Sequence, residues 1–220
     1  MGLFSYCCDA VSRVVSSACS AISNTVSKVG SWVVDTATAI VKLGVELATK
    51  VSDTIKAVGV LLNIIRGDEQ MEELGEKALV SDKKPEDFDS FNDYINHLRH
   101  DVQIDEEKLS QLDEKDRLVR SAIGASIILK GINEILGVTV TPEFMAAVAS
   151  QELDAAAIIN TIKAYKENGL ETGDYSLYLN DELSLDESGK HSHALVEAYQ
   201  KLEPELSIEQ IEDKVMDLKG

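Results

Sequence analysis

The chain has 220 residues, enough for one or two domains with a hydrophobic core, and 44% of them are hydrophobic, as in an ordinary globular protein. Its formal net charge is −18. Such an acidic chain repels phosphate backbones, so we expect no nucleic-acid partner. Only three prolines, with abundant Ala, Leu, Glu and Lys, predict an all-α fold.

The charge is unevenly distributed between an apolar front and an acidic rear. Residues 1–66 carry six basic and four acidic side chains, whereas the remaining residues carry 15 basic and 35 acidic ones. We therefore predict an amphipathic Ser/Thr-rich helical segment at 1–66, an acidic linker with a short helix at 67–88, and an acidic helical domain at 89–220.

Apolar residues recur through the front with the period of an α-helix. From Val11 to Ile65, fifteen steps of three or four residues cover 54 positions, an average of 3.6. An 11-residue repeat of this kind keeps its apolar side on one face of a straight helix. We name this face the front stripe and expect it to contact a membrane or other copies of the chain; its residues are Val11, Val15, Ile22, Val26, Val29, Trp32, Val33, Ile40, Leu47, Val51, Ile55, Val58, Leu62 and Ile65.

The face opposite the front stripe is rich in Ser and Thr and poor in charge. Ser, Thr and Val are mediocre helix formers, so this segment needs a surface on which to fold. In composition and period it resembles the amphipathic helices of lipid-packing sensors and lipid-droplet coats, which implies burial in a lipid surface.

Three glycines interrupt the front at spacings of 14 and 15 residues, namely Gly30, Gly44 and Gly59. They fall on one side of an ideal helix, where they can allow another backbone to approach closely or can act as hinges. The segment is therefore either one long amphipathic helix or a helical hairpin that turns near Gly44.

The acidic rear is predicted to be a helical bundle. The expected helices lie at about 90–112, 114–136, 142–169 with a break near 150–154, 191–202, and 207–218, where Ser207 and Gln210 form a capping box. At most one short strand pair is expected near 174–186, because Tyr175, Leu177 and Leu179 alternate with polar residues.

Catalytic motifs are absent from the sequence, and we expect a protein that is not an enzyme. No nucleophile elbow, Walker loop or dinucleotide fingerprint occurs. His97 and His100 beside acidic residues have metal-ligand spacing, but exposed histidines of this kind are more often solvated. The pair His191 and His193 is expected in an acidic loop. We expect no cofactor and no metal.

Targeting signals are equally sparse. No cleavable signal peptide is recognisable, because a basic n-region is missing and Asp9 and Arg13 interrupt the apolar stretch. Three cysteines form no disulfide framework, which indicates a reducing compartment. We expect a cytoplasmic, peripherally membrane-associated protein. Lipidation of Cys7 or Cys8 and export by a non-classical route stay open.

The leading hypothesis is a membrane-surface-associating or membrane-remodelling protein that uses the front stripe. The first alternative is a self-assembling structural or pore-forming helical protein, which would be a homo-oligomer or filament. The second is a soluble helical adaptor with a helical protein partner. All three require that the front stripe be buried against something, and they differ in what covers it.

Overall fold

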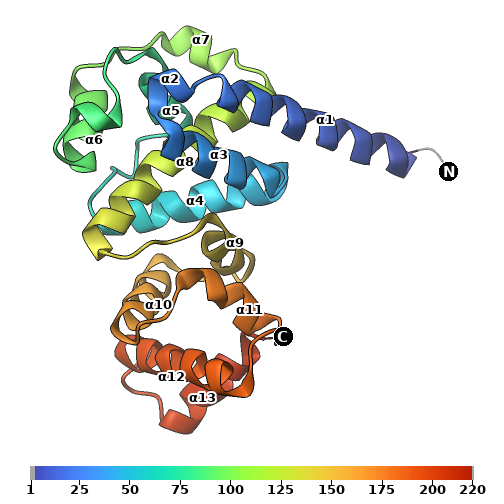
Figure 1. Cartoon of the computed structure of the whole chain (residues 1–220), viewed down its shortest axis with the longest axis vertical. Coiled ribbons are helices and arrows are strands. Elements are labelled where there is room, and N and C mark those ends of the chain that lie inside the picture. Colours follow the sequence, from blue (N-terminus) through green and yellow to red (C-terminus); the bar gives the residue numbers. More distant parts are fainter. Residues whose placement is uncertain (1–2, 220) are drawn as a thin grey trace. The chain divides into compact units, whose positions relative to one another are not determined.

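The structure is a computed structural model that describes the backbone of residues 3–219 and the side chains of residues 12–219 (Figure 1). Regular structure in this range is helical, without a strand, which confirms the predicted all-α fold. The chain divides into two compact units, residues 1–131 (unit 1) and 132–220 (unit 2). The division falls inside helix α8, Glu114–Leu136, whereas the sequence placed it in the 67–88 segment.

The front segment forms four helices: α1 (Leu3–Ser23), α2 (Val26–Val29), α3 (Ser31–Lys42) and α4 (Val45–Leu61). Helix α1 packs against α3, and α3 packs against α4. The breaks before α3 and α4 lie at Gly30 and Gly44, with φ/ψ of 83°/160° and 92°/157°. This backbone region is open essentially only to glycine, so Gly30 and Gly44 determine the bends before α3 and α4. The break between α1 and α2 falls at Asn24 and Thr25 and contains no glycine.

The next part of unit 1 contains α5 (Met71–Val80), the 3₁₀ turn η1 (Pro85–Asp87), α6 (Phe91–His100) and α7 (Glu106–Ser110). The helix expected over 90–112 is therefore two helices. The second begins because Asp105 accepts a hydrogen bond from the Lys108 backbone N–H and caps a new helix.

Helix α8 provides the centre of unit 1, with residues 122–129 all buried. Helix α5 crosses it closely: a Cβ at Gly75 would overlap the Arg120 backbone, and a Cβ at Gly124 would overlap the Met71 backbone. The short helix predicted within 67–88 is α5, and it packs against α8. Because α5 and α8 pack with the front helices into one core, the compact unit extends to Gly131.

Unit 2 contains α9 (Pro142–Ser150), α10 (Ala155–Glu167), η2 (Thr172–Asp174), α11 (Tyr175–Leu179), α12 (Leu185–Leu202) and α13 (Ile208–Asp217). Thr141 and Asp154 cap α9 and α10, which confirms the predicted break near 150–154. Helix α10 packs along α12, and α12 packs against α13. Aromatic residues fill this core, namely Phe144, Tyr165, Tyr175 and Tyr178.

The strand prediction near 174–186 was wrong, because η2 and α11 occupy this region. Tyr175 and Tyr178 lie three residues apart, and both are buried, so the decisive spacing is helical and not alternating. The predicted loop at His191 was also wrong. A capping box between Ser184 and Glu187 starts α12 six residues earlier than the expected helix.

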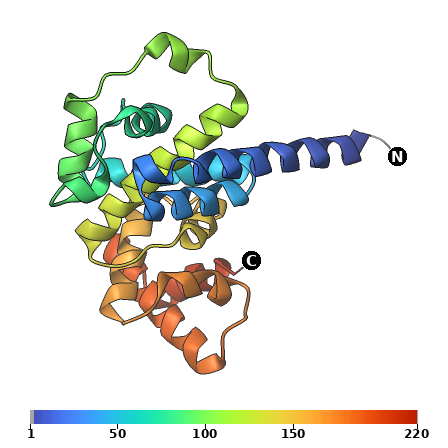
Figure 2. The same cartoon turned by 45° about the horizontal axis from the view of Figure 1, so that its top comes forward.

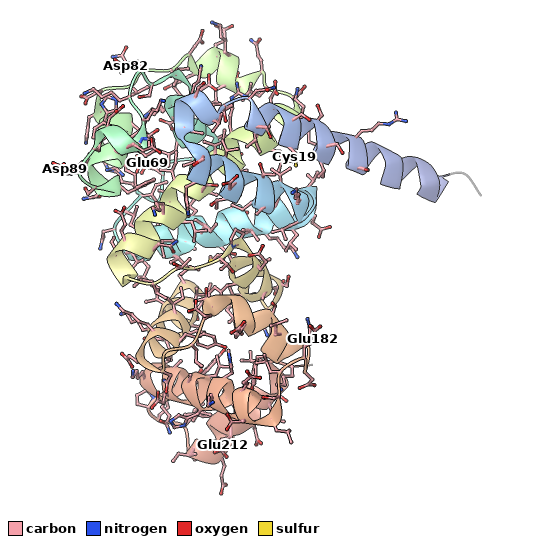
Figure 3. All side chains as sticks on the ribbon, viewed as in Figure 1. Cys19, Glu69, Asp82, Asp89, Glu182 and Glu212 are labelled. Atoms are coloured by element: carbon pink, nitrogen blue, oxygen red, sulfur yellow. The ribbon has the colours of Figure 1, made fainter. Side chains whose placement is uncertain are left out.

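Charged side chains are concentrated outside both cores. Figure 3 labels Asp82 and Asp89 at the periphery of unit 1 and Glu182 and Glu212 at the periphery of unit 2, and all four are exposed. Glu69, by contrast, lies among the helices of unit 1 and is half-buried. The acidity predicted for the rear is therefore mainly a property of solvated surfaces.

Candidate functional site

The front stripe lies mostly inside unit 1. Ile22, Val33 and Ile40 are at most 1% exposed, as are the α4 residues that face the same core. The buried members of the stripe are Ile22, Val29, Val33, Ile40, Val51, Ile55, Val58 and Ile65. In this folded unit they are covered by protein, so they are not available to a lipid surface.

A smaller group of stripe residues reaches the surface. Val26 is 47% exposed, and Val15, Leu47 and Leu62 are half-buried. Trp32 is also half-buried, and the Lys130 ammonium lies 5.0 Å from its ring centroid in a cation–π contact. The Val11 side chain lies outside the described residues. The exposed members are scattered over different helices and do not continue the single stripe predicted from the sequence.

The three glycines of the front play two different parts. Gly30 and Gly44 are the bends already described, and a Cβ at Gly44 would meet nothing within 4 Å. Gly59 lies inside α4, where an added Cβ would lie 2.6 Å from the Ile128 side chain of α8. The first two thus act through backbone conformation, and the third permits close helix packing.

One apolar face remains partly uncovered, on helix α1. Ala18 and Ile22 are fully buried where α1 packs in unit 1, whereas Val14 and Val15 one turn earlier are only half-buried. Figures 1 and 2 both show the N-terminal part of α1 running past the end of α3, away from the other helices of unit 1. Helix α1 therefore extends beyond the core that it helps to build.

The sequence continues the same face along this extension. On an ideal helix with 100° per residue, most of the apolar residues of α1 lie within an arc of about 140°. This arc contains both the buried positions and the apolar positions nearer the start of the helix. The positions in this arc, which we name the α1 face, are Leu3, Phe4, Cys7, Cys8, Val11, Val14, Val15, Ala18, Ala21 and Ile22. The opposite side carries Ser5, Ser12 and Ser16 with a single acid, Asp9.

Hydroxyl groups on the front helices bond to their own helix. Ser20 Oγ donates to the Ser16 carbonyl at 3.0 Å, and Ser23 Oγ donates to the Cys19 carbonyl at 2.9 Å. Ser52 makes the same bond to the Ala48 carbonyl and is only 3% exposed. Because these hydroxyl groups are already hydrogen-bonded, they do not require water as a partner. A Ser/Thr-rich helix face can therefore be buried in a protein core or in an interface.

A cavity of about 450 Å³ in unit 1 contains charges of both signs. Asp53 and Glu72 line it with Lys56 and Arg117. Burial, with the nearby Glu72 carboxylate, raises the pKa of Asp53, and Lys56 opposes this shift. Arg117 donates hydrogen bonds from Nε to the Leu112 carbonyl and from Nη2 to the Ser110 carbonyl. Its guanidinium therefore stabilises the backbone between α7 and α8. These contacts define a polar groove without an assembled nucleophile and base.

The histidines chosen from the sequence do not gather around one point. His97 Nδ1 lies 2.9 Å from Asp101 Oδ2, and its Nε2 lies 3.4 Å from Ser81 Oγ, while His100 is exposed. Among the described residues, no group of three or more His, Cys, Asp or Glu side chains could hold a metal ion. His191, in contrast, is buried in the aromatic core of unit 2, which its sequence neighbours did not indicate.

Comparison with known proteins gave no family: no family model, no curated protein and no solved structure matches the chain. The helices described here include none with the length and hydrophobicity needed to cross a membrane. Helix α1, which runs beyond its packing partner α3 in both views, is the candidate surface.

Proposed function

We propose that this protein attaches to a membrane surface through the N-terminal part of α1, with unit 1 as a folded base. One observation carries the proposal: the α1 face is buried at Ala18 and Ile22 and continues along a helix that runs beyond the other helices of unit 1. An amphipathic helix of this kind can lie in the lipid interface with its apolar side inward. The lipid-binding element is then the start of α1 and not the whole front stripe.

The composition of α1 favours lipid over an acidic or basic protein partner. Between Leu3 and Ser23 the only charged side chains are Asp9 and Arg13, so the segment has no net charge. Its polar side consists largely of serine, whose hydroxyls at positions 20 and 23 are already bonded to the helix. Attachment would therefore depend on burial of apolar area, as in amphipathic helices that recognise loosely packed lipids.

The test is flotation of the full-length chain with small neutral phosphatidylcholine vesicles. The variant Phe4→Asp/Val11→Asp places two carboxylates on the α1 face, and we expect it to lose flotation because charge must then enter the apolar lipid layer. The matched control, Ser5→Asp/Ser12→Asp, adds the same charge to the opposite side of the same helix and should still float. Trp32 fluorescence, which reports on unit 1, should be unchanged in both variants.

Three results would contradict the proposal. Equal flotation of both variants would mean that the α1 face does not enter lipid. No flotation of the wild-type chain, with a molecular mass that rises with protein concentration in light scattering, would identify self-association as the use of this face. A monomeric wild-type chain that never floats would leave a soluble helical adaptor as the better description.

A further inference from the structure

A buried histidine connects three helical elements of unit 2. His191 on α12 is 3% exposed, and its Nδ1 lies 2.8 Å from the Tyr165 hydroxyl on α10. Its ring meets the Tyr165 ring at 75° and stacks on the ring of Tyr178 at 14°, with centroids 5.1 and 5.8 Å away. His191 therefore contacts both α10 and α11 from α12.

The contact with α11 depends on the His191 ring more than on hydrogen bonds. The Tyr178 hydroxyl is buried and has no hydrogen-bond partner among the described residues. The ring of Tyr178 is held instead by stacking on His191 and by the Lys219 ammonium, 4.2 Å from its centroid. Tyr178 therefore contacts one side chain that is always charged and one that can become charged.

The same ammonium holds the C-terminal end of the chain. Lys219 Nζ lies 2.6 Å from Asp181 Oδ1 and 3.3 Å from Ser188 Oγ, which joins the end of the chain to the α11–α12 connection and to α12. Gln151 Nε2 donates to the Leu218 carbonyl at 2.9 Å. The contacts of Lys219 therefore tie the residues after α13 to the same part of unit 2 as Tyr178.

A cavity of about 430 Å³ gives His191 a route to solvent. The charged groups that line this cavity with His191 are Glu171 and Asp174 from the α10–α11 connection and Glu187 and Lys190 from α12 itself. The tyrosines of α10 and α11 complete its surroundings. A proton can thus reach the cavity without unfolding of the unit.

We propose that His191 is an acid-sensitive latch of unit 2: when its ring takes up a proton, η2 and α11 separate from α12 and the contacts of Lys219 are released. The neutral ring fits the aromatic core, whereas an imidazolium there loses most of its hydration. The charged ring would also place a second cation beside Tyr178, next to Lys219.

The direction of the pH effect follows from linkage. Burial lowers the pKa of His191, and the Asp174 and Glu187 carboxylates only partly oppose this shift. As the pH falls below the ordinary histidine range near 6.5, the opened form binds a proton before the closed form does. The closed arrangement is therefore most stable above this range and loses stability as the pH falls toward the lowered pKa of the buried ring.

Hydrogen exchange of the full-length chain tests the latch. Amide protection would be measured at about pH 7.5 and at about pH 5.5, on either side of the ordinary histidine pKa, with correction for intrinsic exchange rates. We expect protection of residues 172–182 and 214–219 to fall several-fold at the lower pH. Protection of α8 residues 118–129 in unit 1 should stay the same and serves as the internal reference.

The variant His191→Gln removes the titratable group and keeps an amide that can hydrogen-bond to Tyr165. In this variant, amide protection of residues 172–182 and 214–219 should not fall at the lower pH. The matched control His193→Gln lies on the same helix but is exposed, beside Glu197 at 3.5 Å, and should behave as wild type. Unchanged wild-type protection of 172–182 between the two pH values would overturn the proposal whether or not His191→Gln folds. An equal loss in a folded His191→Gln chain would also overturn it.

Discussion

At the scale of single residues, one partly buried ion pair links distant parts of unit 1. Arg99 on α6 donates from Nε to Glu69 Oε1 at 2.8 Å and from Nη2 to Glu69 Oε2 at 3.0 Å. The same Nη2 also reaches the Ile64 carbonyl at 3.1 Å, so α6 is attached to the connection between α4 and α5. Burial by itself would raise the pKa of Glu69, but the hydrogen bonds from Arg99 and from the Arg66 N–H lower it overall.

Replacing Arg99 with Met should destabilise unit 1 by about 2 kcal/mol, because Glu69 and the Ile64 carbonyl lose a charged partner. Urea unfolding followed by Trp32 fluorescence measures this effect. The Glu69 pKa is lowered in the folded state, so the contribution is present at neutral pH and is lost as the pH falls through that lowered pKa. The difference between variant and wild type should narrow in acid.

An exposed ion pair of the same unit provides the comparison. Lys50 and Glu46 lie 4.0 Å apart with side chains 51% and 91% exposed. Lys50→Met should therefore change the free energy of unfolding by less than about 0.5 kcal/mol. A similar cost for Lys50→Met and Arg99→Met would show that the Arg99 network has no special role.

At the scale of elements, the crossing of α5 and α8 is the contact that most depends on residue size. Gly75 and Gly124 lie at reciprocal positions, each against the backbone of the other helix, at Arg120 and Met71. Backbone atoms cannot rotate away as a side chain can, so any added carbon must separate the helices. The crossing also brings Arg120 Nε to Glu76 Oε2 at the same interface.

Gly75→Ala and Gly124→Ala should each destabilise unit 1 by about 1–3 kcal/mol through overpacking. The control is Gly67→Ala, because a Cβ at Gly67 meets nothing within 4 Å, and this variant should unfold close to wild type. Trp32 fluorescence in urea again measures the transition. If either Gly75→Ala or Gly124→Ala matched Gly67→Ala in stability, the backbones of α5 and α8 would not approach as closely as described.

At the scale of the whole molecule, charge sets the lipids that the protein can approach. Unit 2 carries six basic and 18 acidic side chains, and the chain as a whole has a net charge of −18. The proposed attachment segment contributes no net positive charge. An anionic surface therefore repels the protein at long range, and salt screens this repulsion over about 10 Å at 0.1 M ionic strength.

We expect vesicles in which part of the phosphatidylcholine is replaced by phosphatidylserine to float less protein at low salt. Raising the salt concentration should restore flotation, whereas flotation with purely neutral vesicles should depend little on salt. The salt dependence is measured by flotation of the wild-type chain with both vesicle types at low and at high salt. Binding that increased with phosphatidylserine would point to a basic attachment site and against the α1 face.

Local signals predicted much of the helical fold. The helix at 114–136, the caps at Thr141 and Ser207 and the break before Asp154 all lie where periodicity and capping residues placed them. The exceptions are short elements. The alternating positions Tyr175, Leu177 and Leu179 fit a strand or one helical turn equally well, and burial of Tyr175 and Tyr178 decides for the helix.

The candidate site could be predicted only in part, because periodicity reveals an apolar face without naming what covers it. Ile22, Val33 and Ile40 continue the same pattern as Val11 and Val15, yet protein covers the first three completely. Aspartate at Val33 or Ile40 would consequently test the core of unit 1 and not a lipid surface. His191 escaped sequence analysis because its partners, Tyr165 and Tyr178, are 26 and 13 residues away on other helices.

The sequence by itself determined the all-α class, the acidic surface and the amphipathic character of the front, because these follow from composition, spacing and caps along the chain. Tertiary structure decided which part of the front stripe is core, since α3, α4 and α8 bury it from positions distant in sequence. It also decided where the compact units divide and which histidine is enclosed. These properties depend on contacts between helices, and contacts of that range leave no period in the sequence.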